Sequence, residues 1–229
     1  MNTIVDRNKR LIFIGGMKVD MVQIPEVVSI MEVWIKNREF GNYIVISNAN
    51  DVAMSRCKDQ VRIAVNESSL SVPDGISLIL ASRCYGFSLK RRVYGPDLMY
   101  EFLASTADQG YRHYFYGSTE SVLSKLVYNL KEKFSGLEVS GTYSPPFSGL
   151  TDSESEETIE IINASAPDVL WVGLGCPNQQ LWMYKNRNKL KVPVIVGVGA
   201  AFDFFAQTKK QAPEWIRNNG FEWLFRLLS

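Results

Sequence analysis

The stretch that decides the fold is residues 168–182, DVLWVGLGCPNQQLW. Its first half is a nearly continuous apolar run, which is typical of a strand buried on both faces of a parallel sheet. The residues after Pro177 predict a helix with Gln179 and Gln180 in its first turn. Ligands of open α/β sheets bind beyond the carboxyl ends of the strands, where a glycine such as Gly175 lets the backbone approach them and a helix N-terminus offers N–H groups to an anion. The segment therefore predicts the floor of a site for a phosphorylated polar ligand; the alternative is an ordinary strand–helix turn.

Outward from this stretch, strand-like apolar runs alternate with helical patterns along the chain. The alternation predicts an α/β fold with a mostly parallel sheet and helices on both faces, of the Rossmann-like kind. We expect a single domain over residues 1–229, either undivided or built from two interlocked α/β halves that meet near residues 85–96. The expected strands are residues 11–15, 43–47, 70–72, 113–117, 137–142, 169–175 and 192–199, and the clearest helices are residues 27–40, 122–134 after a Ser118 cap, and 151–166 with a capping box at 151–154.

The composition narrows the class of protein. The 229 residues are 46% hydrophobic and 21% charged, as in ordinary globular proteins that fold in water. Lysine and arginine number 25 against 24 aspartates and glutamates, so no basic excess argues for a nucleic-acid partner. The three cysteines lack a CxxC pair, which indicates a reducing compartment and no zinc site. There is neither an N-terminal signal core nor an apolar run of about 18 residues, so we expect a cytoplasmic protein.

Asp74 is the candidate general base. It follows a short apolar strand in the sequence Val-Pro-Asp-Gly at 72–75. A carboxylate on a tight turn at a strand end is where an enzyme would hold a base. The alternative is an Asp-Gly turn whose carboxylate bonds its own backbone.

Arg92 is the candidate phosphate ligand. It precedes Pro96 and Asp97, which fit the first turn of a helix. A guanidinium held before such a turn suits a diphosphate, because it binds phosphate oxygens through two hydrogen bonds. A surface cation paired with a nearby carboxylate is an equally good interpretation.

Other signals are weak. Residues 15–16 and 117–120 are two further glycine-containing loops that could open a helix and cradle phosphate, although neither is a GxGxxG or Walker motif. His113 is the only histidine and lies in an aromatic strand, so we interpret it as structural; a Ser-His or Cys-His nucleophile would depend on it. Cys176 is interpreted as a small packing residue. No Asp-x-Asp pair or metal-ligand spacing occurs, so cations and backbone N–H groups would have to stabilise a departing phosphate.

Six motifs occur in order along the chain. They are Pro-Asp-Gly at 73–75, Arg-Val-Tyr-Gly-Pro-Asp-Leu at 92–98, Tyr-Ser-Pro-Pro-Phe at 143–147, Gly-Leu-Gly-x-Pro-x-Gln at 173–179, Phe-Asp-Phe…Ala-Pro-x-Trp at 202–215 and Glu-Trp-Leu-Phe-Arg-Leu at 222–227. This order resembles the WecG/TagA/CpsF family, whose members are glycosyltransferases of family 26 in bacterial surface polysaccharide assembly. The resemblance spans residues 12–228, nearly the whole chain.

The resemblance implies an inverting, metal-independent transfer of N-acetylmannosamine or a related sugar from a UDP-sugar to a polyprenyl-diphosphate-linked acceptor. It implies no cofactor, a place on the inner face of the cell membrane, and no nucleic-acid partner, and it leaves a homo-oligomer open. By position, Asp74 matches the family's base, Arg92 the arginine facing the diphosphate, and Gln179 the glutamine that orients the donor sugar. Asn50 best fits the asparagine of a Thr-x-Asn motif, and Asp203 a uridine contact.

The chain also departs from the family pattern. Lys and Glu usually flank the glutamine where this chain has Asn178 and Gln180, while Gln207 and Gln211 stand where glycine and arginine are usual. We expect Gln207 to strain a turn built for glycine. The family's basic, apolar C-terminal tail is expected to be absent, and residues 221–228 are interpreted as a terminal helix docked on the core or as part of a membrane-seating surface.

These departures keep two competing functions open. One is a catalytically weak or inactive relative that binds a nucleotide sugar or an assembly partner. The other is a nucleotide-dependent oxidoreductase on a doubly wound fold, which the missing dinucleotide fingerprint opposes.

Overall fold

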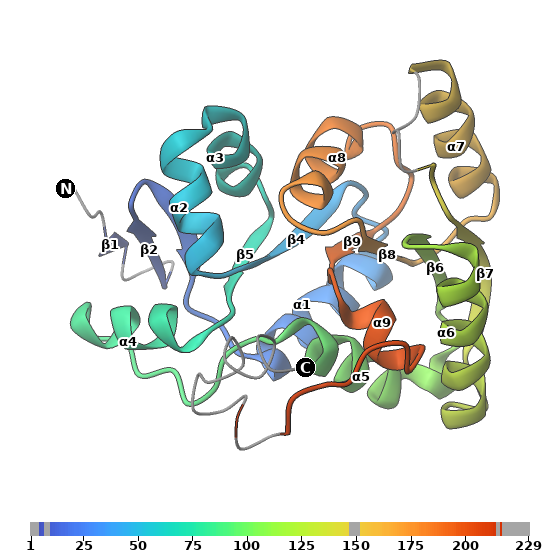
Figure 1. The fold of residues 1–229 in the computed structure, drawn as a ribbon, viewed down its shortest axis with the longest axis horizontal. Coiled ribbons are helices and arrows are strands. Elements are labelled where there is room, and N and C mark those ends of the chain that lie inside the picture. Colours follow the sequence, from blue (N-terminus) through green and yellow to red (C-terminus); the bar gives the residue numbers. More distant parts are fainter. Residues whose placement is uncertain (1–4, 7–9, 147–151, 214–215, 217–229) are drawn as a thin grey trace.

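The computed structural model describes residues 5–6, 10–146, 152–213 and 216. Its centre is a six-stranded sheet in the order β5-β4-β9-β8-β6-β7, in which every neighbouring pair is parallel. This confirms the predicted α/β, Rossmann-like fold (Figure 1). The strands are β4 (Asn42–Ser47), β5 (Leu70–Pro73), β6 (Arg112–Gly117), β7 (Glu138–Tyr143), β8 (Val169–Gly173) and β9 (Val194–Gly197).

Helices cover both faces of the sheet because successive strand side chains alternate between them. Ile44 and Ile46 of β4 enter one hydrophobic cluster, whereas Tyr43 and Val45 enter the other. Helices α1, α5, α6 and α9 pack on the first face, and α2, α3, α4, α7 and α8 on the second. The helices are α1 (Ile24–Asn37), α2 (Ala49–Cys57), α3 (Asp59–Asn66), α4 (Ile76–Cys84), α5 (Gly95–Thr106), α6 (Glu120–Lys133), α7 (Asp152–Ala164), α8 (Asn178–Asn186) and α9 (Ala201–Phe205), with a 3₁₀ turn η1 (Ala107–Gln109).

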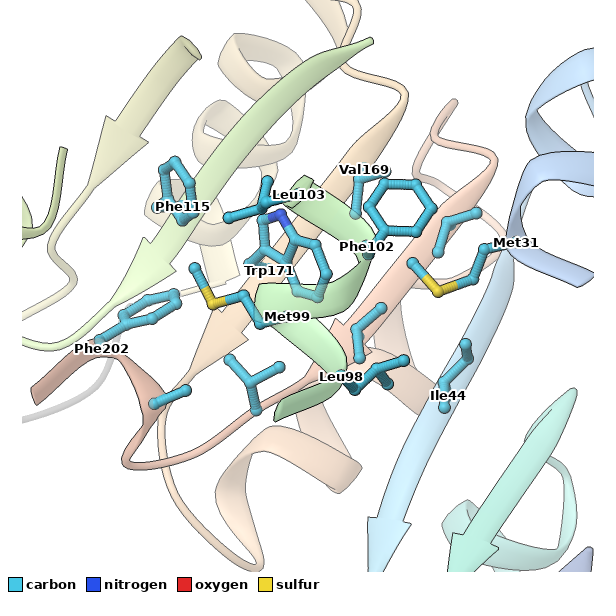
Figure 2. Close-up of a cluster of buried hydrophobic side chains, with 14 of the residues drawn as sticks. Met31, Ile44, Leu98, Met99, Phe102, Leu103, Phe115, Val169, Trp171 and Phe202 are labelled. Carbon is cyan, nitrogen blue, oxygen red and sulfur yellow. The ribbon is translucent and has the colours of Figure 1, made fainter. Parts of the chain in front are cut away.

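Trp171 of β8 is the largest fully buried side chain of the first face. Figure 2 shows it between Met99 and Phe102 of α5, with Phe202 of α9 nearby. Phe102 meets the Trp171 ring edge-on at a centroid distance of 5.9 Å. Each such side chain contributes about 1.5–3 kcal/mol when it leaves water, so this face holds α5 and α9 firmly against the strands.

The expected strand at residues 11–15 does not join the parallel sheet. β2 (Leu11–Ile14) instead forms a three-stranded antiparallel sheet with β1 (Val5–Asp6) and β3 (Met17–Asp20). Gly15 and Gly16 make the two-residue turn between β2 and β3, with φ angles of +59° and +85°. Two positive φ angles match the right-handed twist of a hairpin, so the prediction of a helix-opening phosphate loop here was wrong.

Other boundaries shift by a few residues. α1 begins at Ile24, three residues before the expected start, because Gln23 and Glu26 form a capping box. Thr119, not Ser118, caps α6 by accepting a hydrogen bond from the Val122 N–H at 3.3 Å. The capping box expected at 151–154 and the interpretation of residues 221–228 lie outside the described residues. Within the described part of the chain, no helix is both long and apolar enough to cross a membrane.

Candidate active site

The candidate site is a cavity of about 210 Å³ at the carboxyl ends of four adjacent strands, β5, β4, β9 and β8. The residues that follow these strands all contribute to its wall. This is the crevice in which open α/β sheets bind ligands. Its polar and backbone lining includes Asn48, Asp51, Asp74, Gly175, Gln179, Gln180 and Gly199.

Asp74 stands directly after β5 and lines this cavity. Its N–H donates to the Ser47 carbonyl at 2.7 Å, which fixes the turn against the neighbouring strand. Gly75 follows with a φ of +94°, a conformation that favours glycine and turns the chain into α4. The Asp74 side chain is 16% exposed, so it is held by its surroundings yet open to a ligand.

Arg92 reaches Asp74 from the loop before α5. Its Nη1 lies 3.2 Å from Asp74 Oδ1, and the Arg92 side chain is only 15% exposed. The guanidinium also lies over the Tyr94 ring, 4.3 Å from the centroid, a cation–π arrangement that fixes its orientation. The structure therefore brings the predicted base and the predicted phosphate ligand into direct contact.

Gln179 faces the same cavity from the first turn of α8. Its Oε1 accepts a hydrogen bond from the Gly199 N–H at 3.1 Å, and the residue is 5% exposed. A Cβ on Gly197 would lie 3.1 Å from Gln179 Nε2 and 2.8 Å from Met183 Cε, so a larger residue at the end of β9 would displace the ends of both side chains. The Gln179 amide is thus held by its hydrogen bond to Gly199 and by close packing against β9.

Gly175 has a backbone conformation that favours glycine. Its φ is +76°, and a Cβ built on it would meet nothing within 4 Å. Its carbonyl accepts the first hydrogen bond of α8, from Gln179 N at 2.9 Å. Backbone at this position is therefore accessible to a ligand in the cavity.

Asp51 is a site residue that the sequence analysis missed. Its side chain is fully buried in α2, where Oδ1 accepts hydrogen bonds from Gln180 Nε2 at 2.7 Å and Cys176 Sγ at 3.0 Å, and Oδ2 from Asn48 N at 2.9 Å. Burial raises the pKa of Asp51. The hydrogen bonds from Cys176, Asn48 and Gln180 lower this pKa, but by less than burial raises it. Asn48 and Asp51 form the capping box of α2, and that Asn-x-x-Asp spacing was the one local signal in the sequence.

Cys176 is a hydrogen-bond donor in this arrangement. Burial, followed by the neighbouring Asp51 carboxylate, raises the pKa of its thiol to about 12. A thiol that stays protonated is a poor nucleophile. The structure thus agrees with a non-nucleophilic Cys176, although its thiol contacts a carboxylate as well as apolar neighbours.

Three predicted substrate ligands do not line the cavity. One is Arg92, which reaches Asp74 in the cavity wall, and the others are Asn50 and Asp203. Asn50 is exposed on α2, with Nδ2 3.5 Å from Met54 Sδ, and the wall includes Asn48 and Asp51 but not Asn50. Asp203 of α9 is held by Thr208 Oγ1 at 3.2 Å and Lys209 Nζ at 2.9 Å, also away from the wall. All three residues remain predictions as ligands.

His113 lies in β6 and is 1% exposed, and its Nδ1 accepts a hydrogen bond from Trp171 Nε1 at 3.1 Å. This burial agrees with the interpretation of His113 as a structural residue. Among the described residues, no group of three or more His, Cys, Asp or Glu side chains could hold a metal ion.

A parallel α/β sheet whose crevice holds side-chain amides and a carboxylate paired with an arginine is typical of enzymes that act on nucleotide-linked or phosphorylated substrates. The model of the glycosyl transferase WecG/TagA/CpsF family matches residues 12–229. The chain therefore belongs to this family and is a glycosyltransferase, which confirms the resemblance and displaces the oxidoreductase interpretation.

Two relatives illustrate the similarity. The N-acetylglucosaminyldiphosphoundecaprenol N-acetyl-beta-D-mannosaminyltransferase of Bacillus spizizenii is 29% identical over 207 residues, which are 90% of this chain and 79% of that protein. A protein of the same name from Staphylococcus aureus strain NCTC 8325 is 27% identical over 222 residues, which are 96% of this chain and 85% of that protein.

Proposed function

We propose that this enzyme transfers an N-acetylhexosamine of the N-acetylmannosamine type from a UDP-sugar to an N-acetylglucosaminyl diphosphate carried on a polyprenyl chain. The names of the two relatives support both the sugar and the acceptor. The observation that carries the proposal is the cavity that Asp74 and Gln179 share, with Arg92 bonded to Asp74 at 3.2 Å. The product would serve bacterial surface polysaccharide synthesis.

In the proposed reaction, a hydroxyl oxygen of the acceptor sugar attacks the anomeric carbon of the donor from the side opposite UDP. The new glycosidic C–O bond forms as the anomeric C–O bond to UDP breaks, and its electron pair leaves with UDP, so the configuration inverts. The Asp74 carboxylate takes the hydroxyl proton, which makes the attacking oxygen more nucleophilic as the bond forms. Asp74 is suited to this role because it is anchored at a strand end and faces the cavity.

The other proposed roles follow from what each group offers. The Gln179 amide, fixed by Gly199, would hydrogen-bond the donor sugar, and backbone at Gly175 would approach it closely. Arg92 would face a diphosphate, and its cation together with backbone N–H groups would stabilise departing charge without a metal ion. We propose that Asn50 and Asp203 contact the ligand only where it extends beyond the cavity, because neither residue lines the cavity.

The proposal extends to the setting of the reaction. A lipid-linked acceptor would bring the enzyme to the inner face of the cell membrane as a peripheral protein of the cytoplasm. We propose one domain over residues 1–229, with self-association as an additional possibility and no nucleic-acid partner.

The test is UDP release from UDP-N-acetylhexosamines with and without a polyprenyl-diphosphate-N-acetylglucosamine analogue. Asp74→Asn keeps the size of the side chain but removes the base, so acceptor-dependent release should fall by about 10²-fold or more. Asp59→Asn is the matched control, because the Asp59 side chain is 76% exposed on α3 and does not line the cavity. In the part of the chain that the structure describes, its ion pair is with Arg62. Equal loss in both variants, or full activity of Asp74→Asn, would contradict the proposed base.

A second candidate function is a weakly active relative that binds a nucleotide sugar. The observation that favours it is Gln180, whose amide is bonded to Asp51 where the family pattern usually has a glutamate. Its Oε1 has no hydrogen-bond partner among the described residues, which marks an incomplete polar arrangement. Wild-type binding of UDP without acceptor-dependent release would favour this candidate.

A further inference from the structure

A second and larger hollow has Arg92 in its lining. It has a volume of about 500 Å³ and is formed between the start of α1, the loop before α5, and α5 itself. α1 and α5 pack next to each other on the first face of the sheet (Figure 1). We call it the α1–α5 groove.

One wall of the α1–α5 groove is apolar. Ile24, Pro25 and Val28 of α1 line it, and Pro25 is exposed. Ile24 and Val28 pack on the core with one side and remain only partly buried. The wall therefore offers hydrocarbon surface that a hydrophobic ligand would cover.

The rim of the groove is cationic. Lys90, Arg91 and Arg92 are consecutive, and Glu101 is the only acidic residue in its described lining. Neither Lys90 nor Arg91 has an ion-pair partner among the residues that the structure describes. The Lys90 N–H donates to Gln23 Oε1 at 3.4 Å, which links this loop to the start of α1. Positive charge beside an apolar wall complements an anion attached to a hydrocarbon chain.

Arg92 connects the groove to the candidate site. It lines the groove, and its Nη1 is 3.2 Å from Asp74 Oδ1, which lines the cavity. An acceptor with its sugar at Asp74 and its diphosphate at Lys90 and Arg91, beside Arg92, would carry its hydrocarbon chain onto Ile24 and Val28.

We infer that the α1–α5 groove binds the first isoprenyl units of the acceptor, with Lys90 and Arg91 contacting its diphosphate. This inference rests on the proposed function for the identity of the ligand. It assigns the apolar wall of α1 a role in selecting prenyl over short-chain acceptors.

The test measures binding to the full chain, so it does not depend on turnover. Two probes are compared by calorimetry: farnesyl-diphosphate-N-acetylglucosamine, and the same headgroup with a methyl group in place of farnesyl. Wild type should bind the farnesyl probe more tightly. Val28→Asp should weaken farnesyl binding by about tenfold or more and leave the affinity for the methyl probe unchanged, because only the prenyl chain touches residue 28.

Val33→Asp is the matched control, since Val33 lies on the same helix, is 51% exposed and does not line the groove. Val28→Thr, which keeps the shape of the side chain, replaces Val28→Asp if the latter does not fold. Lys90→Ala and Arg91→Ala should weaken the binding of both probes, and they should make that binding less dependent on salt concentration.

Three outcomes would overturn the inference: equal affinity of wild type for the two probes, an unchanged farnesyl preference in Val28→Asp, or the same loss in Val33→Asp. Binding to sugar-free phosphatidylglycerol vesicles is measured as well. If Val28→Asp weakens vesicle binding as much as farnesyl binding, the groove seats a bilayer and the acceptor assignment is wrong. Failure of the proposed function would give a different result. The wild-type protein would then bind the farnesyl probe but release no UDP when either probe is offered as the acceptor.

Discussion

His113 shows how burial fixes the state of a single residue. Its ring contacts the rings of Phe102 and Trp171 at centroid distances of 6.0 and 6.2 Å, and its Nδ1 accepts the Trp171 Nε1 hydrogen bond. Burial lowers the pKa of His113 from its usual 6.5 to about 3. The neutral imidazole is therefore the form that the folded protein holds.

We predict that the His113 imidazole does not titrate above pH 5. The chain has one histidine, so its proton NMR signals need no assignment. Because the pKa is depressed in the folded state, the stability it contributes is present above the unfolded pKa of about 6.5 and is lost as the pH falls towards 3. The full loss is on the order of 5 kcal/mol. A midpoint near 6.5 in the folded protein would contradict the burial of this ring.

Asp74 and Asp51 show that position in the fold gives two carboxylates different tasks. Asp74 is partly exposed at the cavity and contacts a cation, whereas Asp51 is fully buried and accepts hydrogen bonds from neutral donors. We assign Asp51 a positioning task, because it links the start of α2 to Cys176 and Gln180 beside α8. Of the two carboxylates, Asp74 is the more exposed, and it is the one that we propose to meet a hydroxyl.

At the scale of elements, the end of α9 carries a local conflict. Gln207 follows the helix with a φ of +56°, the left-handed conformation that favours glycine, as its place in the family pattern suggested. Its N–H still donates to the Phe204 carbonyl at 3.1 Å, so the turn itself is well formed.

Gln207→Gly should therefore raise the free energy of unfolding by roughly 0.5–1 kcal/mol, the relief of left-handed strain less the extra entropy of an unfolded glycine. Thermal melting should show a midpoint about 1–4 °C higher. Gln207→Ala keeps the Cβ and the strain, so it serves as the control and should show no such gain. A gain in both variants would mean that the glutamine side chain, not its φ, is unfavourable.

At the scale of the whole molecule, one sheet joins the two halves that the sequence suggested on either side of residues 85–96. β4 pairs with β9 through four residue pairs, Asn42 with Val194 to Val45 with Gly197. The hydrophobic cluster on the first face also contains residues of both halves, including Ile44 and Trp171. Separating the halves would expose this hydrophobic surface to water, which is unfavourable.

We expect the protein to unfold in a single cooperative transition. Far-ultraviolet circular dichroism, which follows the helices, and tryptophan fluorescence should give the same midpoint in urea. Two separated transitions would show that the halves are independent domains and would contradict the proposed single domain.

Local patterns in the sequence were sufficient for most elements. The apolar run and glycines of residues 168–182 predicted β8, the turn and α8, and the Pro-Asp-Gly turn placed Asp74 at a strand end. These features depend on backbone preferences and on periodicity over a few residues, which the chain carries wherever it folds. The resemblance to a family then supplied the chemistry.

Only the tertiary structure decided which distant residues meet. It placed Asp51 against Gln180, 129 positions away, put Arg92 on Asp74, and moved β2 out of the parallel sheet into a hairpin. It also opened the α1–α5 groove beside Arg92. The sequence by itself determined the elements and the turn that carries the base. The pairing of strands and the packing of helices determined the site, because contacts between distant residues depend on the arrangement of the whole chain.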